Sequence, residues 1–199
     1  MSIVRKYLTG VLVFLFTLIS FNVSALTSAD NLLIKGALTG NIKLVKKAIN
    51  NGANLNAKES AKGNTALMLA AYYKHSKIVD LLIKSKAEVN EVDLAENTAL
   101  MKAAWTGSVE SARLLLEANA DVNAIEVDGM TALMVASFYG HIDAVKLLVE
   151  AGSNILIKDN DGYTALMNAQ DQKHTDIVEY LKKLQGDVIT SSVVGELKT

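Results

Sequence analysis

The chain has 199 residues and contains neither cysteine nor proline. Without cysteine it cannot form a disulfide, cannot use a thiolate as a nucleophile, and has no residue to carry the lipid of a bacterial lipoprotein. Without proline it lacks the residue that most rigidly sets the first turn of a helix. The fold must therefore be held together by packing and hydrogen bonds alone.

An excess of charge of one sign is also missing, because 20 lysine and arginine residues stand against 21 aspartate and glutamate residues. Residues 1–25 hold two of the basic residues, Arg5 and Lys6, and none of the acidic ones. The rest of the chain is mildly negative, and such a balance does not predict the basic surface that nucleic acids or anionic membranes require. We expect neither as a partner once residues 1–25 are removed.

What the chain does have is an internal repeat. The tetrapeptide Thr-Ala-Leu-Met occurs four times at intervals of 33 residues, beginning at Thr65, Thr98, Thr131 and Thr164. A degenerate first copy begins at Asn31, 34 residues before Thr65, which places one extra residue within the segment 57–62. A fixed period of this length is typical of a solenoid, in which each unit buries its apolar face only against its neighbours.

Each unit predicts two short helices and a hairpin. Threonine is a good N-cap, and the Ala-Leu-Met-x-Ala-Ala pattern that follows is rich in strong helix formers. Gly40, Gly107 and Gly140 end the first helix, where a left-handed residue costs least as glycine. Both helices are about two turns long, too short to persist alone in water. Stacking of the units is therefore obligatory.

This pattern resembles the ankyrin repeat, whose consensus runs Gly-x-Thr-Pro-Leu-His-x-Ala-Ala-x-x-Gly-His and closes with Gly-Ala-x-x-Asn. The resemblance covers residues 29–186 in five tandem units and implies an all-α ankyrin solenoid. Alanine replaces the family's proline at positions 66, 99, 132 and 165. Methionine replaces its histidine at positions 68, 101, 134 and 167, where we expect it to fill core space.

The chain divides into a leader, five repeats and a tail. We place a signal peptide at 1–25, a linker at 26–28, repeats at 29–62, 63–95, 96–128, 129–161 and 162–186, and a tail at 187–199. The first and last repeats are predicted to cap the stack. In the last one, Gln170 and Lys182 stand where most of the other repeats have an apolar residue, and Lys183 follows, as a solvent-facing end requires.

The leader predicts export. Arg5 and Lys6 precede an apolar stretch over residues 11–21, and Val23-Ser24-Ala25 puts small residues where a signal peptidase reads. This layout is typical of a secretory signal peptide cleaved before Leu26. The alternative is an uncleaved membrane anchor, although polar and small residues interrupt the run that a span needs. We expect an exported protein, periplasmic in a Gram-negative cell and otherwise secreted.

Two sets of residues could suggest chemistry: the histidines His75, His141 and His174, and the acids Asp93, Asp128 and Asp161. The histidines stand at equivalent positions of separate repeats, about 10 Å apart in a stack of helices, which is too far to share one metal ion. The acids lie in predicted hairpins, where hydrogen bonding within the turn explains them. Without a nucleophile elbow or a phosphate-binding loop, the sequence predicts no enzyme, no metal site and no cofactor.

Aromatic residues make up only 6% of the chain, yet they gather at equivalent positions of the repeats. In the ankyrin family these positions close the first helix and the hairpin and face the concave groove, where partners commonly bind. Exposed rings in a line form an apolar stripe, and tryptophan and tyrosine dominate interface hot spots. The candidate partner-binding residues are Tyr72, Tyr73, Trp105, Phe138, Tyr139 and Tyr163. The alternative is that these rings pack on one another and only stabilise the stack.

Together these features predict an exported, non-catalytic and monomeric module that binds a protein partner in its concave groove. Two other functions fit the same sequence. One is a secreted effector that acts on a protein of another cell, and the other is a companion that protects or activates an exported enzyme. The fold alone does not separate them, because a fold does not determine its partner.

Overall fold

The computed structural model describes residues 26–196, with the backbone alone described over 187–196. The predicted signal peptide and its alternative, a membrane anchor, both concern residues 1–25, which lie outside the described residues. The last three residues of the predicted tail, 197–199, lie outside them as well.

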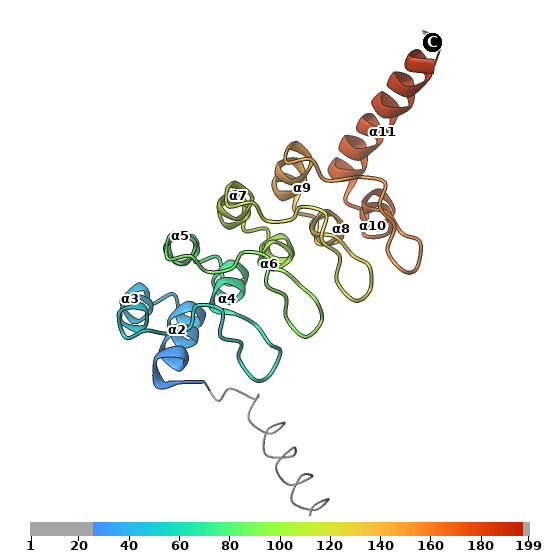
Figure 1. Cartoon of the computed structure of the whole chain (residues 1–199). Helices are drawn as coiled ribbons and strands as arrows, with labels where there is room; N and C mark the ends of the chain where they lie inside the picture. Colours follow the sequence, from blue (N-terminus) through green and yellow to red (C-terminus); the bar gives the residue numbers. More distant parts are fainter. Residues whose placement is uncertain (1–25, 197–199) are drawn as a thin grey trace, which may run out of the picture.

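Five helix pairs follow one another along the described chain. The pairs are α2 (Ser28–Thr39) with α3 (Ile42–Asn50), α4 (Ala66–Tyr72) with α5 (Ser76–Lys84), α6 (Ala99–Thr106) with α7 (Val109–Glu117), α8 (Ala132–Phe138) with α9 (Ile142–Glu150), and α10 (Ala165–Asp171) with α11 (Thr175–Glu196). The first helices form one row and the second helices another (Figure 1). The all-α repeat solenoid expected from the sequence is confirmed.

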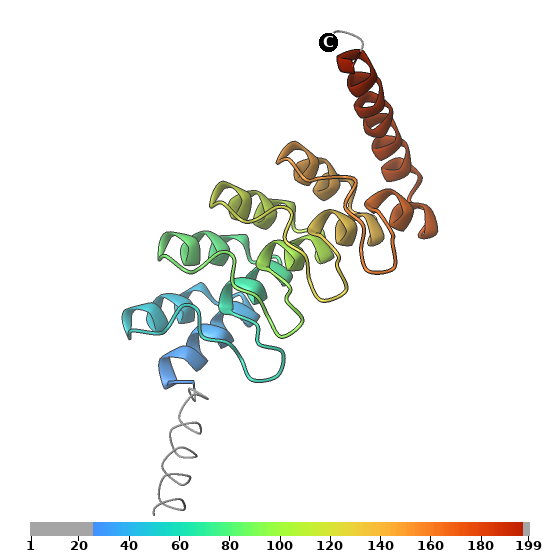
Figure 2. The same cartoon turned by 45° about the vertical axis from the view of Figure 1, so that its right-hand side comes forward.

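The segments between pairs loop out beyond the row of first helices, all on the same side (Figures 1 and 2). They are hairpins closed by very few backbone bonds, and the single β-bridge seen between residues 26 and 196 joins Lys58 and Thr65. Neighbouring hairpins are also joined, for example by the bond from the Leu94 N–H to the Lys62 carbonyl, at 2.9 Å. The hairpins therefore form a continuous layer.

The extra residue predicted in the first hairpin is confirmed. There the closing bond runs from the Glu59 N–H to the Asn64 carbonyl, five residues on, whereas the Asp93 N–H bonds the carbonyl of Asn97, four residues on. The hairpin absorbs the insertion, and the helices on either side keep their places in the stack.

Threonine begins the first helices α4, α6, α8 and α10 as the sequence predicted, whereas α2 begins after Thr27, four residues before the degenerate copy at Asn31. In α4 the Thr65 hydroxyl accepts a bond from the Met68 N–H at 3.3 Å, and the Met68 sulfur lies 3.5 Å from the Thr65 N–H. The methionine therefore retains a weak capping contact in addition to filling space. Three of the four methionines in this position are fully buried, but Met167 is 39% exposed because no further first helix covers α10. The expectation that Met167 fills core space was wrong.

The core lies between the helices of successive repeats. Leu67, Leu100 and Leu133 of the first helices are almost completely buried, and one leucine of each following second helix is buried with them, namely Leu82, Leu115 and Leu148. Alanines such as Ala70 and Ala103 are also fully buried and let neighbouring first helices approach closely. Each repeat therefore buries its apolar side against the next one.

Asparagines in the turns after the second helices join each repeat to the next. The Asn56 side chain accepts a bond from the Glu88 N–H at 2.9 Å, and Asn90 and Asn123 make the same bond one and two repeats on. Leu156 takes the place of asparagine in the fourth turn. The asparagine ladder therefore ends where the stack itself ends.

The last helix differs from the sequence-based expectation. We placed the end of the last repeat at Gly186 with a separate tail after it, but α11 runs without interruption through Gly186 to Glu196. Its C-terminal part extends away from the stack (Figures 1 and 2). At the other end, α2 begins at Ser28, inside the segment we assigned to a linker, with Thr27 as its N-cap.

Candidate protein-binding groove

Five of the six predicted aromatic residues lie together at the ends of α4, α6 and α8. Tyr72 lies edge-on to Trp105, with ring centres 6.4 Å apart, and Trp105 stacks on Tyr139 at 5.0 Å and an angle of 22°. Tyr73 contacts Tyr72, and Phe138 contacts Tyr139, each edge-on at 5.1 Å. The rings form one unbroken row across three repeats, here called the aromatic row.

The aromatic row is also open to solvent. Tyr73 is 45% exposed, and Trp105 and Tyr139 are each 40% exposed. Tyr72 and Phe138 lie beside them and are both half-buried. The rings therefore pack on one another and still offer an exposed surface. Packing for stability and binding of a partner, the two alternatives from the sequence, can thus involve the same side chains. That a partner binds there stays a prediction.

The sixth residue, Tyr163, lies apart from the aromatic row. It is 36% exposed at the base of the last hairpin, where its N–H donates to the Asp159 carboxylate at 2.8 Å. Among the described side chains, none of the ring contacts includes it. The structure therefore gives no sign that Tyr163 extends the row, although the residue stays accessible.

Charged residues border one end of the aromatic row. A groove of about 340 Å³ lies between the hairpin at 59–64 and the ends of α4 and α6. Tyr72, Tyr73 and Trp105 line this groove. Lys62 and other residues of the hairpin line it as well, together with Lys102 of α6. The groove can therefore take an apolar side chain next to a polar or charged one.

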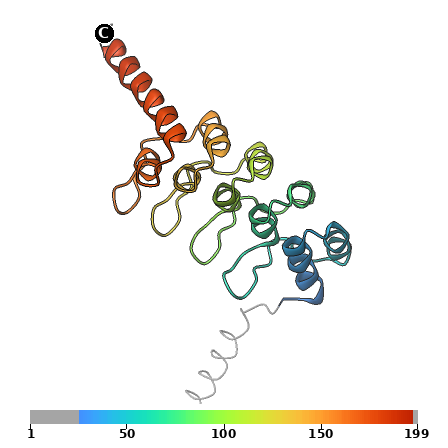
Figure 3. The same cartoon turned by 180° about the vertical axis from the view of Figure 1, so that it is seen from behind.

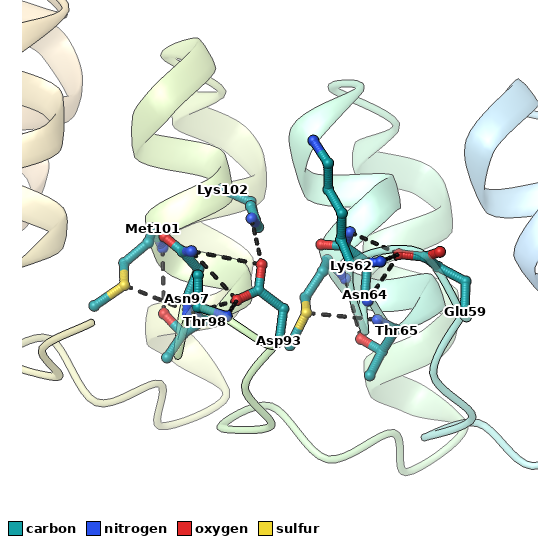
Figure 4. A network of polar contacts seen from close by, with 11 residues as sticks. Glu59, Lys62, Asn64, Thr65, Asp93, Asn97, Thr98, Met101 and Lys102 are labelled. Carbon is teal, nitrogen blue, oxygen red and sulfur yellow. Dashed lines mark hydrogen bonds and ion pairs between the residues drawn. The ribbon is translucent and has the colours of Figure 1, made fainter. Parts of the chain in front are cut away.

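Each hairpin is organised by one carboxylate that accepts bonds from the backbone of its own turn. Asp93 accepts from the N–H groups of Ala95 and Asn97, both at 2.9 Å. The same position in the other repeats is held by Glu59, Glu126 and Asp159. Figure 4 shows the Glu59 and Asp93 networks in neighbouring repeats.

These carboxylates correct part of the sequence analysis. We assigned turn bonding to Asp93, Asp128 and Asp161, and only Asp93 has this role. Asp128 and Asp161 lie two residues further along, and it is their N–H groups that donate to Glu126 and Asp159. The signal that would have found the right residues is their spacing, since positions 93, 126 and 159 follow the 33-residue period.

Asp93 is also half of a buried ion pair. Its carboxylate lies 2.6 Å from the Lys102 ammonium, and the two side chains are only 3% and 12% exposed. Burial acts to raise the pKa of Asp93, but the hydrogen bonds from Lys102 and Asn97 and the charge of Lys102 outweigh it. The pKa therefore lies below its ordinary value of 3.8. The pair fastens α6 to its hairpin beside the groove.

Sequence reasoning missed Lys102. Its position in the other three repeats that carry Thr-Ala-Leu-Met is held by Leu69, Val135 and Asn168, so it is the only ionisable residue in this column of those four repeats. Lysine in a short helix that is otherwise apolar is rarely buried without a partner. That mismatch was the available signal, and Asp93 supplies the partner.

Histidines hold the helix ends that carry the rings. The Nε2 atom of His141 lies 3.1 Å from the Trp105 carbonyl, and that of His174 lies 3.0 Å from the Phe138 carbonyl. Each ring thus bonds the preceding repeat individually. Within residues 26–196 there is no group of three or more metal-ligating side chains. The structural role predicted for these histidines agrees with these contacts.

The histidine contacts depend on glycine in the preceding repeat. Gly107 has a φ of +66°, and a Cβ placed there would lie 2.6 Å from the His141 ring. Lys74 holds the position equivalent to Gly107 one repeat earlier, with φ of +61°. The residue opposite Lys74, at the position equivalent to His141, is the small Ser108. In these two repeats, glycine and histidine therefore occur together and are replaced together.

Burial raises the pKa of the Tyr139 phenol, and the nearby Tyr72 phenol raises it further. Tyr72 belongs to α4 and Tyr139 follows the end of α8, two repeats further along the stack. The aromatic row thus has polar tips as well as apolar faces, a combination that suits an interface.

Comparison with known proteins identifies the family. The model of the family described as ankyrin repeats, three copies, matches residues 33–126 and 121–191. These matches cover well over half of the chain, so the chain belongs to the ankyrin repeat family. The comparison with curated proteins found no match. Ankyrin repeats typically act as protein-binding modules without catalysis, and none of the helices within residues 26–196 has the length and apolar character of a membrane span.

The pairing of glycine with histidine predicts a specific coupling. Gly107→Ala should lower the free energy of unfolding by about 2–3 kcal/mol, from left-handed strain and from the contact with His141. Gly52→Ala is the matched control, because Gly52 also has a positive φ but a Cβ placed there would have nothing within 4 Å. Adding His141→Ser to Gly107→Ala should restore on the order of 1 kcal/mol in urea unfolding. Strictly additive effects would contradict the pairing.

The Asp93–Lys102 pair predicts a pH-dependent contribution to stability. Because the folded pKa of Asp93 is lowered, its contribution is present above about pH 4 and is lost as the pH falls through the folded pKa. Asp93→Asn should therefore cost on the order of 2 kcal/mol at neutral pH, since it leaves a mostly buried ammonium without its partner.

Urea unfolding of both proteins from about pH 7 to about pH 3 measures this contribution. The difference between wild type and Asp93→Asn should shrink below about pH 4. Asp159→Asn is the matched control, since it changes the equivalent carboxylate in a hairpin where the described side chains form no ion pair. A difference that stays constant with pH would show that the charge of Asp93 does not contribute.

Proposed function

We propose that the chain is an exported module that holds a protein partner along the aromatic row. The observation that carries this proposal is the continuity of five rings that are in mutual contact, with three of them well exposed to solvent. A stack that needed the rings only for stability would bury them, as it buries the leucines and alanines of the same helices.

The dimensions of the aromatic row suit an extended segment of a partner. Rings on three successive repeats span roughly 20 Å, at about 10 Å for each packed helix. About six residues of extended chain cover that distance. Side chains on one face of such a segment alternate, so they can reach the spaces between rings from different repeats.

The groove at the end of the aromatic row suggests how the segment is anchored. An apolar or aromatic side chain of the partner would lie against Tyr72 and Trp105, with Lys62 beside it to meet a polar group. Lys102 is already neutralised by Asp93, so Lys62 is the groove cation that we assign to the partner. Buried anchors of this kind carry most of the binding energy in protein interfaces.

Export is the second part of the proposal, and its support is the layout of residues 1–25. In a Gram-negative cell the module would act in the periplasm. A secreted effector and a companion of an exported enzyme would use the same aromatic row, and they differ only in where the partner resides. We favour the general interaction module because it rests on the groove alone.

The aromatic row predicts that Trp105 is the strongest anchor, because it contacts rings of the repeats on both sides. A partner captured from cell-envelope extract should bind Trp105→Ala roughly thirtyfold more weakly, a loss of about 2 kcal/mol. The variant should stay folded, with stability reduced by about 1–3 kcal/mol through the two lost ring contacts.

Affinity and thermal midpoint must be measured on the same proteins. Leu156→Ala is the matched control, because Leu156 is an exposed apolar residue in a turn away from the row. The proposal requires the control to bind like the wild type. Unchanged affinity in Trp105→Ala, together with lower stability, would assign the aromatic row to packing and contradict the proposal.

The export proposal predicts that the protein isolated from its host begins at Leu26. Amino-terminal sequencing of that protein checks it directly. A chain that retains residues 1–25 would contradict cleavage and favour the membrane anchor. Cell fractionation then distinguishes a periplasmic protein from a released one, and the effector function requires release.

A further inference from the structure

The second helices form a row on the side of the molecule away from the hairpins (Figure 3). In the second position of each, an exposed charged residue changes sign along the stack, in the order Lys43, Lys77, Glu110, Asp143, Asp176. At this position the basic residues therefore lie on the first two repeats of the outer face, and the acidic ones on the last three. A net charge close to zero conceals this separation.

Five pairs of charged residues on the outer face, at equal distances from the middle helix α7, are opposite in sign, whereas Lys183 of α11 has the uncharged Asn50 as its counterpart. The helices α5 and α9 lie one repeat away on either side, and α3 and α11 lie two repeats away. Residues in the same position of these paired helices are Lys77 with Asp143, Asp80 with Lys146, Lys84 with Glu150, Lys43 with Asp176, and Lys46 with Glu179. Every one of these pairs joins a basic residue to an acidic one.

This pattern has a geometric consequence. A two-fold rotation about an axis parallel to α7 places α5 of one copy opposite α9 of a second copy, with the same helix positions facing each other. Such an interface is isologous, because each contact occurs twice. The outer face is therefore complementary to itself when the stacks of two copies lie antiparallel.

Apolar residues support the same arrangement. Leu81, Leu114 and Leu147 occupy one position of α5, α7 and α9 and are half-buried on the outer face. The rotation places Leu81 opposite Leu147 of the second copy and brings the two copies of Leu114 together on the axis. Leu81 and Leu114 already form part of the floor of a groove of about 550 Å³, which Lys77 and Lys84 border.

Contacts within one copy do not compete strongly with this arrangement. Asp80 and Lys84 form a pair at 2.7 Å, and Glu110 and Arg113 form one at 3.5 Å, each along a single helix and largely exposed. Exposed pairs of this kind contribute little to stability. On the axis α7 faces its own copy, so Glu110, Arg113 and Glu117 each meet the same residue of the second copy, and the Glu110–Arg113 pair along one helix offsets part of that repulsion.

We propose that two copies of the chain associate antiparallel through the outer face of the second helices, with the two-fold axis along α7. This dimer differs from the monomer expected from the sequence, an expectation that took no account of the separation of charge. The face measures roughly 40 by 14 Å when the first turns of α11 are taken with the four nine-residue helices, which is on the order of 550 Å² for each copy. That area lies at the lower end for specific interfaces, so the dimer is weak and salt-sensitive.

The aromatic row lies on the other side of the stack, so the dimer leaves both grooves open. Failure of the dimer would leave the proposed function untouched, and failure of partner binding would leave the dimer untouched. A second copy fits this face better than a purely anionic surface does, because its basic residues also pair with the acidic half of the face.

Sedimentation equilibrium of the purified chain tests the proposal. At about 0.02 M salt the chain should dimerise, and at about 1 M, where charges are screened within about 3 Å, it should dissociate. Lys77→Glu and Asp143→Lys should each weaken the dimer about tenfold, because each faces a like charge twice. The double variant Lys77→Glu/Asp143→Lys should recover the wild-type dissociation constant within about threefold.

The recovery cannot come from folding within one copy, because the two residues belong to helices two repeats apart. Lys158→Glu is the matched control: it makes the same change of charge at an exposed position in a hairpin, and it should leave the dimer unchanged. A chain that stays monomeric at low salt, or a double variant no better than the single ones, would overturn the proposal. So would a monomer that binds phosphatidylglycerol vesicles through Lys77, since the basic repeats would then serve a membrane surface.

Discussion

The contact between one repeat and the next is the interaction on which the whole structure depends. A pair of helices about two turns long cannot bury its own apolar side, and here each pair buries it against its neighbours. Small and medium residues such as Ala103 and Leu133 fill that contact. With no disulfide and no proline, every other feature of the molecule is a consequence of this packing. The row of rings and the row of charges exist because equivalent residues stack in register.

Polar bonds fix the register that packing alone would leave loose. The Asn90 side chain bonds the next turn, His141 bonds the preceding helix end, and the carboxylate of Asp93 closes its own hairpin while binding Lys102. These bonds lie at the turn, the helix end and the hairpin, so they constrain each repeat at three separate places. His141 and His174 fix the ends of α6 and α8, and this pre-organises the rings there for a partner.

Much of the fold could be predicted from the sequence, because a 33-residue period fixes which residues are equivalent. Period and helix-forming composition predicted the repeats, the N-caps and the extra residue of the first hairpin. The aromatic residues were found by the same rule, and their mutual contacts needed coordinates. Three features escaped. Lys102 is charged where the equivalent residues of the other three repeats with Thr-Ala-Leu-Met are not. The hairpin carboxylates were sought at Asp128 instead of Glu126. The continuation of α11 past Gly186 has no counterpart in another repeat from which to infer it. A periodic argument misses what occurs once, such as Lys102 and the continuation of α11, but the carboxylates at positions 93, 126 and 159 recur and were within its reach.

The central claim is that the aromatic row is the surface a partner covers, and the chain contains its own reporter. Trp105 is the single tryptophan, it lies in the middle of the row, and it is 40% exposed. Quenching of its fluorescence by acrylamide, measured with and without saturating partner, tests the claim most directly. The account predicts a shift of the emission to shorter wavelength and much weaker quenching when the partner is bound. Emission and quenching that stay unchanged at saturation would contradict it.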